Sequence, residues 1–211
     1  MRLRNPANVD LSSAGVSPWF LEPKGPLNWA EMFDNADPVE VEIGCGKGLF
    51  LINAATQQPL RNYCGIEIAR KYALFAASRV ARRGLTNVRV ARADAQQVLR
   101  EWIADRSVAT LHVYFPDPWW KRRHKKRRVF TESLVADAAR ILIDGGELRF
   151  ASDVEEYYKV MHGLVRRHPQ FAEREPTTPR EPEHDMDYLT NFDRKSRQAG
   201  RVVYRATFVL R

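Results

Sequence analysis

The sequence predicts an α/β fold, a three-layer sandwich in which a mostly parallel sheet lies between two layers of helices. Strand-like and helix-like segments alternate five times between residues 39 and 167, and the chain then ends in strand-like segments. This alternation is typical of parallel sheets whose strands are joined by helical crossovers. A glycine-rich turn joins the first of these strands to the first helix, and acidic residues directly follow several strands. Such strand ends are where open α/β sheets bind ligands.

The composition indicates a single intracellular domain with a polyanionic partner. The 211 residues can bury one core, and we expect a main domain at residues 38–211 after a partly mobile arm at residues 1–37. Lys and Arg number 34 against 26 Asp and Glu, which gives a net charge of +8. Cys45 and Cys64 form no CxxC pair. Because the start lacks an apolar signal core and no long apolar run follows, we expect a soluble, cytoplasmic protein that does not contact membranes.

Hydrophobic patterns place the elements of the first half of the chain. The apolar residues alternate or run continuously in the strand-like segments and recur at helical spacing in the others. Gly84 suits the end of a helix, because glycine adopts the left-handed conformation of a C-cap without strain. We expect strands at 39–43, 62–67 and 87–91, and helices at 28–33, 49–55, 69–83 and 95–103.

The second half begins with an apolar strand that prolines terminate. Pro116 lacks an amide donor and restricts the residue before it to extended geometry, so the strand should end at Phe115. Gly145-Gly146 should end the next helix before a further strand begins. We expect strands at 108–115, 147–151, 171–175 and 202–210, helices at 129–143 and 155–167, and a long loop at 176–200.

The glycine-rich turn favours a nucleoside ligand without a pyrophosphate. The pattern Glu42-x-Gly44-x-Gly46-x-Gly48 lets the backbone approach a ligand closely at a helix N-terminus. A dinucleotide fingerprint needs a third glycine where Leu49 stands. The observed spacing is commoner in proteins that bind S-adenosylmethionine. The alternative is a tight strand-to-helix turn that binds nothing.

Acidic residues stand at successive strand ends and form the candidate ligand site. Glu67 ends the second strand, where a carboxylate can accept hydrogen bonds from two ribose hydroxyls. Asp94 could accept from an adenine amino group, or it could simply be the N-cap of the following helix. Asp117 lies between two prolines at the end of the fourth strand. It could face the ligand, or it could merely cap a turn.

A dense basic run follows Asp117 and indicates contact with RNA. Residues 121–128 read KRRHKKRR, with seven permanent cations in eight positions. Such a run is usually a solvated face, but Trp119 and Phe130 flank it, and aromatic rings stack on unpaired bases. The predicted phosphate contacts are Arg122, Arg123, Lys125, Lys126, Arg127 and Arg128.

These motifs together resemble the bacterial tRNA (guanine-N7-)-methyltransferase family of the TrmB type. The resemblance rests on VEIGCGKG, GIE, the ADA around Asp94, FPDPWWKRRHKKRR, ASD at 151–153 and TNFD at 190–193. It implies a Rossmann-like class I methyltransferase fold, with a mostly parallel seven-stranded sheet and an antiparallel C-terminal strand. It also implies S-adenosylmethionine as the donor and N7 of a guanine in the variable loop of tRNA as the acceptor.

The resemblance also assigns residues to the two ligands. The donor site would contain Glu42, Glu67, Asp94 and Asp117. The substrate would be held by Lys121, Asp153, Thr190, Asn191, Phe192 and Asp193. The family usually has TKFE where this chain has TNFD, so the lysine is lost and the acid is shorter.

Asp117 is our candidate catalytic residue. N7 of guanine already carries a free lone pair, so no general base is needed, and methyl transfer moves positive charge from sulfur to the base. Catalysis should therefore consist of alignment and of a carboxylate near the developing charge. Asp117 could equally accept a hydrogen bond from the guanine. Asp153 is a second candidate for guanine recognition, or the N-cap of the next helix.

Three other functions are compatible with parts of the sequence. A methyltransferase acting on an exocyclic amine would use Asp/Asn-Pro-Pro-aromatic, which Asp117-Pro118-Trp119 matches only partly because the second proline is missing. A non-catalytic RNA-binding protein on the same scaffold would not need the intact glycine turn and acids. A nicotinamide-dependent oxidoreductase is a distant third. The five histidines have no metal-ligand spacing, so we expect no metal.

Overall fold

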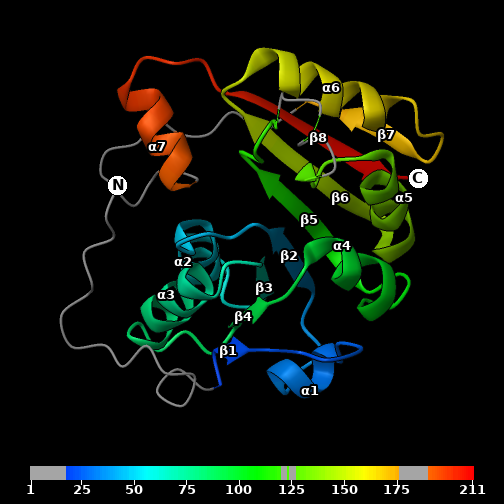
Figure 1. Ribbon diagram of the computed structural model, residues 1–211. Coiled ribbons are helices and arrows are strands. Elements are labelled where there is room, and N and C mark those ends of the chain that lie inside the picture. The colour runs from blue at the N-terminus through cyan, green and yellow to red at the C-terminus, as the bar shows by residue number, and fades with distance from the viewer. Residues whose placement is uncertain (1–17, 120–122, 124–126, 176–189) are drawn as a thin grey trace.

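The computed structural model describes residues 18–119, 123, 127–175 and 190–211. The predicted contacts Lys121, Arg122, Lys125 and Lys126 lie outside the described residues. In the described part of the chain, one sheet has eight strands in the order β1-β4-β3-β2-β5-β6-β8-β7 (Figure 1). The strands are β1 Phe20–Leu21, β2 Val39–Ile43, β3 Asn62–Glu67, β4 Val88–Arg92, β5 Val108–Tyr114, β6 Leu142–Ser152, β7 Phe171–Arg174 and β8 Tyr204–Leu210.

The order of the strands reverses between β2 and β5. The chain runs outward from β2 through β3 to β4, then returns to place β5 on the other side of β2. The pairs from β1 to β6 are all parallel, and β8 is antiparallel to both β6 and β7. The predicted mostly parallel sheet with an antiparallel C-terminal strand is confirmed. The expected seven strands are wrong, because the short β1 pairs with β4 and adds an eighth strand at the edge. Ligands bind at such a reversal of strand order, at the carboxyl ends of the strands.

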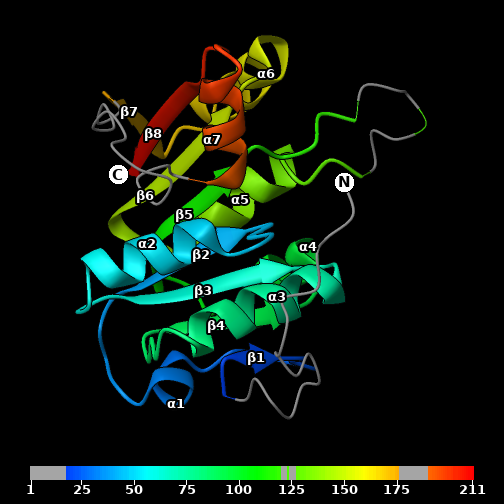
Figure 2. The ribbon, with the colours of Figure 1, turned by 90° about the vertical axis from the view of Figure 1, so that its left-hand side faces the viewer.

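Helices cover both faces of the sheet and enclose two apolar cores. Helices α2 Leu49–Gln57 and α3 Arg70–Ala81 lie side by side on one face (Figure 2), where Leu51, Tyr63 and Val80 are buried together. On the other face, α5 Glu132–Ile141 and α6 Glu155–Arg166 pack on Leu111 and Phe150. The three predicted layers are therefore present.

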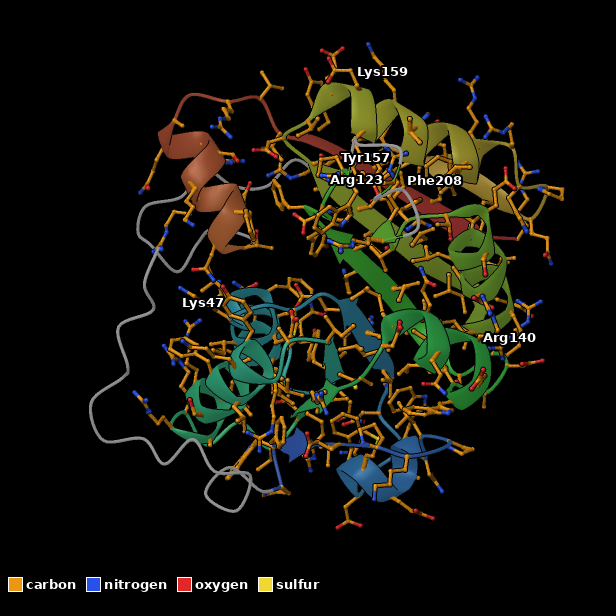
Figure 3. The ribbon with its side chains drawn as sticks, viewed as in Figure 1. Lys47, Arg123, Arg140, Tyr157, Lys159 and Phe208 are labelled. Carbon is orange, nitrogen blue, oxygen red and sulfur yellow. The ribbon has the colours of Figure 1, made fainter. Side chains whose placement is uncertain are left out.

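The helix expected at 95–103 differs in the structure. It is a short α4, Ala95–Gln97, followed by a π-helix, Val98–Trp102. The guanidinium of Arg140 from α5 donates to the carbonyls of Leu99, Arg100 and Ile103 at the end of this helix. Arg140 thus supplies the partners that these carbonyls lack within the helix (Figure 3).

The Gly145-Gly146 pair lies inside β6 rather than ending the preceding helix. Helix α5 stops at Ile141 and β6 starts at once, with Leu142 paired to Val108. A side chain at Gly146 would place its Cβ 2.8 Å from the Ile143 carbonyl oxygen and 3.1 Å from that of Ala109. The glycine is therefore required by the close approach of two backbones, not by a helix end.

The N-terminal arm contains the helix expected at 28–33 and an unexpected strand, and the predicted loop at 176–200 contains an unexpected helix. From the arm, β1 pairs with β4 at the edge of the sheet, and α1 Trp29–Phe33 packs Phe33 into the main core. From the predicted loop at 176–200, residues Asn191–Gln198 form the helix α7. Both figures place α7 next to α2, beyond the tip of β5 (Figures 1 and 2). No helix among the described residues is long and apolar enough to cross a membrane.

Candidate active site at the carboxyl ends of the strands

The glycine-rich turn after β2 uses its glycines for two different physical reasons. Gly44, Gly46 and Gly48 have φ of +71°, +52° and +68°, a region that disfavours side chains. A Cβ at Gly48 would lie 2.9 Å from the Cβ of Ala76, so this glycine lets α2 and α3 pack closely. A Cβ at Gly44 would meet nothing within 4 Å. The space beside Gly44 is therefore open for a ligand to approach the backbone.

We expect Gly48→Ala to destabilise the fold by about 2–4 kcal/mol, because it combines a positive φ with a clash against α3. Gly44→Ala is the matched control, since it carries the positive φ alone and should cost about 1 kcal/mol. Urea unfolding followed by circular dichroism measures both. Equal losses for the two variants would contradict the close-packing role of Gly48.

Two buried carboxylates lie behind this turn. Glu42 on β2 is 3% exposed, and its Oε2 has no hydrogen-bond partner within the part of the chain that the structure describes. Burial, with a smaller contribution from the negative charge of Glu67, raises the pKa of Glu42 to about 8. Glu67 at the end of β3 accepts from the backbone N–H of Gly46 at 3.0 Å and of Ala69 at 2.8 Å. The carboxylates of Glu42 and Glu67 therefore lie close enough to interact, next to the glycine turn.

Asp94 follows β4 and lies at the same edge of the sheet. It is exposed, and its Oδ1 accepts from the backbone N–H of Gln96 at 2.9 Å. Asp94 is therefore the N-cap of α4, and the capping interpretation is confirmed. Contact between Asp94 and an adenine stays a prediction.

The loop that carries Asp117 is strained on both sides. Phe115 and Trp119 have φ of +51° and +41°, so the expectation of extended geometry before Pro116 is wrong. Residues held in such conformations cluster at functional sites, where surrounding contacts fix them. Here the backbone N–H of Phe115 donates to the carbonyl of Ala151 at 2.8 Å, and Arg128 Nε donates to the Pro118 carbonyl at 2.7 Å. The loop presents Asp117 as an exposed carboxylate.

Arg128 therefore has an internal role in addition to any contact with RNA. Its guanidinium lies 5.3 Å above the ring of Tyr157, a buried residue of α6. The charges of Arg128 and Asp117 both act on the hydroxyl of Tyr157, although burial is what chiefly raises its pKa to about 12. Arg128 thus ties the loop of Asp117 to α6, the helix that carries Tyr157 (Figure 3).

The TNFD segment forms the start of α7 and contacts the loop of Asp117. Thr190 is the N-cap, and its hydroxyl accepts from the backbone N–H of Asp193 at 3.0 Å. The ring of Phe192 stacks on Phe115 with centroids 6.2 Å apart and is 58% exposed. Asn191 is half-buried beside it. The structure therefore brings TNFD next to Asp117, although the two are far apart in the sequence.

Asp153 and Asp193 both hold α7 in place. The carboxylate of Asp193 is 2% exposed and forms an ion pair with Arg205 of β8. Asp153 accepts from the hydroxyl of Ser196 at 2.7 Å and from Arg201 at 3.1 Å. Asp153 does not cap α6, whose N-cap is Val154. These two predicted substrate contacts are therefore engaged within the protein.

Two further residues of the basic run belong to the described part of the chain. Arg123 and Arg127 are exposed, and the guanidinium of Arg127 lies 5.1 Å over the ring of Trp119. Arg127, like Arg128, therefore contacts the loop of Asp117. Among the described residues, no group of three or more His, Cys, Asp or Glu could hold a metal ion.

Sequence reasoning missed α7, although a capping pattern was present. Thr190 stands three residues before Asp193, which is close to the Ser/Thr-x-x-Glu box that begins helices. Gly200 follows with a φ of +67°, as is common at a helix end. The prolines at 176, 179 and 182 favoured a loop for the whole segment. For β1, only two residues long, the sequence holds no comparable pattern.

Comparisons with known proteins identify methyltransferases as relatives of this chain. A family model described as "Putative methyltransferase" matches residues 36–206. The tRNA (guanine-N(7)-)-methyltransferase of Rhodopirellula baltica is 40% identical over 217 residues, covering 99% of this chain and 78% of that protein. The protein of that name from Actinobacillus pleuropneumoniae is 35% identical over 185 residues, covering 87% and 74%.

Solved structures confirm the fold. The 16S rRNA methyltransferase KamB superposes with a TM-score of 0.63 at 16% identity, covering 86% of this chain and 92% of that one. The aminoglycoside resistance methyltransferase NpmB1 gives a TM-score of 0.58 at 17% identity, covering 82% and 87%. At such identities the likeness concerns the fold alone. From the family model and the two relatives in sequence, the chain belongs to the tRNA (guanine-N(7)-)-methyltransferase family.

Proposed function

We propose that the protein transfers a methyl group from S-adenosylmethionine to N7 of a guanine in the variable loop of tRNA. The observation that carries the proposal is the unpartnered, buried Glu42 carboxylate of the described residues, which lies on β2 just before the glycine turn that Glu67 binds. Strand β5, which leads into the loop of Asp117, is the parallel neighbour of β2. Family membership supports the same reaction, because the relatives carry the name of this activity.

The residues present fit a cationic donor that carries a nucleoside. Glu42 offers a buried carboxylate oxygen without a partner in the described part of the chain, and a positively charged ligand would satisfy it. Gly44 leaves space beside the backbone, and Glu67 is placed to accept from ribose hydroxyls. When bound, the donor supplies an activated methyl group on a sulfonium. Glu42, Glu67 and Asp94 would hold it, together with the turn at Gly44–Gly48.

Asp117 provides the charge that the reaction needs. Asp117 follows β5, the parallel neighbour of the strand that carries Glu42, and its loop is fixed by Arg128 and by the stack of Phe115 on Phe192. Positive charge that develops on the guanine ring is stabilised by a fixed carboxylate, which needs no reorganisation during the reaction. The exposed ring of Phe192 is suited to pack against the extruded base.

The substrate side combines positioning and charge. Thr190, Asn191 and Phe192 reach the site from the first turn of α7, while Asp153 and Asp193 keep that helix in place. Arg123 and Arg127 supply positive charge near the loop of Asp117 for the phosphates of the RNA. In this arrangement, Lys121 and the other cations of the run would extend the same contact.

Incubation with labelled donor and unmodified tRNA tests the proposal. We expect one 7-methylguanine per tRNA, mapped to the variable loop by nuclease digestion and mass spectrometry. A product of N6-methyladenine or a methylated cytosine amine would replace the proposal with an exocyclic-amine methyltransferase. Donor binding absent in calorimetry would instead indicate a non-catalytic RNA-binding protein.

A further inference from the structure

A second cluster of positive charge lies on the other side of the site from the basic run. It comprises Lys47 of the glycine turn, Arg79 of α3, and Arg194 and Lys195 of α7, which we call the turn–helix cluster. Arg79 donates to the backbone carbonyl of Lys47 at 2.7 Å. Figure 3 shows Lys47 in the region between α2 and α7, away from Arg123 and Tyr157. Three elements that are distant in sequence therefore bring cations together.

The charges of this cluster repel one another. Burial lowers the pKa of Lys47, and the positive charges of Lys195, Arg79 and Arg194 lower it further. Within the described part of the chain, neither Lys47 nor Lys195 forms an ion pair. A protein that gathers like charges at such a place, without carboxylates on these two ammonium groups, is stabilised by an external anion that offsets the repulsion.

The residues around the cluster indicate which anion it would bind. Lys195 Nζ lies 5.5 Å over the ring of Phe192, which stacks on Phe115 next to the loop of Asp117. Lys47 Nζ lies 5.8 Å over the ring of Phe75 on α3. The charges that shift the pKa of Lys47 are cations, not the carboxylates of the donor pocket. The cluster therefore extends from the glycine turn, where the donor would bind, to the first turn of α7, whose Phe192 stacks on the loop of Asp117.

We infer that Lys47 and Lys195 hold a backbone phosphate of the bound RNA between the glycine turn and α7. This inference rests on the proposed function, since it adds a second phosphate site for the same tRNA. The basic run would hold the backbone on one side of the target guanine, and the turn–helix cluster would hold it on the other. A phosphate at this place also links α7 to the glycine turn, so RNA binding would fix the helix that carries Phe192.

Single and double charge removals test the inference. The variants are Lys47→Gln, Lys195→Gln and the combination, and the control is Arg166→Gln, an exposed cation on the last turn of α6. Affinity for an unmodified tRNA transcript is measured over a series of salt concentrations, and donor affinity is measured by calorimetry without RNA. We expect each single variant to bind tRNA roughly fivefold more weakly, with a salt slope smaller by about one.

The double variant tests whether both lysines bind the same phosphate, and the donor measurement separates RNA binding from donor binding. If one phosphate bridges both lysines, the two losses are less than additive, and the donor affinity of Lys195→Gln is unchanged. A salt slope equal to that of Arg166→Gln would overturn the inference. A loss of donor affinity in Lys195→Gln that matches its loss of tRNA affinity would also overturn it, because Lys195 would then serve the carboxylate of the donor. Absence of tRNA methylation by the unaltered protein would contradict the proposed function itself, whereas normal methylation with unchanged slopes contradicts only this inference.

Discussion

Replacing Asp117 by asparagine should lower the turnover number by about 10²- to 10³-fold while leaving the affinity for S-adenosylmethionine nearly unchanged. The size of the effect is that of removing one fixed electrostatic group from a transition state in which charge develops. The amide side chain would keep the shape of the carboxylate, and the loop would keep its contacts, because Arg128 and Phe192 hold it through Pro118 and Phe115. Single-turnover methylation of tRNA and calorimetry with the donor separate the two quantities.

The control for Asp117→Asn removes the same charge elsewhere. Asp144 is an exposed carboxylate that pairs with Arg106 at 2.8 Å, near the start of β6 and away from the strand ends that form the site. Surface pairs of this kind contribute less than about 1 kcal/mol to stability, so Asp144→Asn should retain full turnover. Full turnover by Asp117→Asn as well would refute the role of its carboxylate, and a thermal melt confirms that both variants are folded.

The replacement Glu42→Gln should stabilise the free protein and weaken donor binding, two effects of opposite sign. The unfolded chain has the ordinary carboxyl pKa of 4.5, and burial raises the pKa of Glu42 in the folded protein to about 8. Stability is therefore lost progressively as the pH rises from 4.5 to 8, because the unfolded chain ionises first. Glutamine cannot ionise, so we expect a gain of about 2 kcal/mol near neutral pH and almost none in acid. Urea unfolding at a series of pH values measures the difference.

Donor affinity should fall by about 30-fold or more in Glu42→Gln, because a buried charge pair loses one partner. In the unaltered protein, the affinity should rise as the pH approaches the pKa of about 8, since only the ionised carboxylate pairs with a cation. Calorimetry over this pH range measures both effects, and comparison with the variant removes the titration of the donor itself. A pH dependence that persists in Glu42→Gln would show that another group titrates.

Glu40 lies on the same strand as Glu42 and provides a matched control, because its pKa is lowered whereas that of Glu42 is raised. Burial alone would raise the pKa of Glu40, but a 2.7 Å hydrogen bond with His112 and the charges of His112 and Arg61 lower it overall. Burial lowers the pKa of His112, against the hydrogen bond and the negative charge of Glu40, which raise it. Glu40→Gln should therefore destabilise the protein at neutral pH by about 1–3 kcal/mol and leave donor affinity unchanged.

Much of the fold follows from local sequence, because each element carries its signal within a few residues. The fully buried strand β2 is a short run rich in β-branched residues before the glycines, and α5 begins after Thr131, whose hydroxyl accepts from the backbone N–H of Leu134. The predicted helix and strand boundaries were wrong where contacts with residues far away in the sequence determine the local structure. The glycine pair lies inside β6 because that strand already begins at Leu142, which pairs with Val108 of β5. The helix after Asp94 changes to a π-helix where Arg140 binds its last carbonyls.

The sequence by itself determined which acidic residues stand at the carboxyl ends of the strands, where we propose that the donor binds. In parallel strands, residues that end successive strands meet at one edge of the sheet, so Glu42, Glu67 and Asp117 had to lie together once the strands were recognised. Only the tertiary structure decided the substrate side. The place of α7 depends on Asp193 meeting Arg205 and on Phe192 meeting Phe115, and the raised pKa of Glu42 depends on everything that surrounds it. Such contacts join residues far apart in the chain, and no local pattern specifies them.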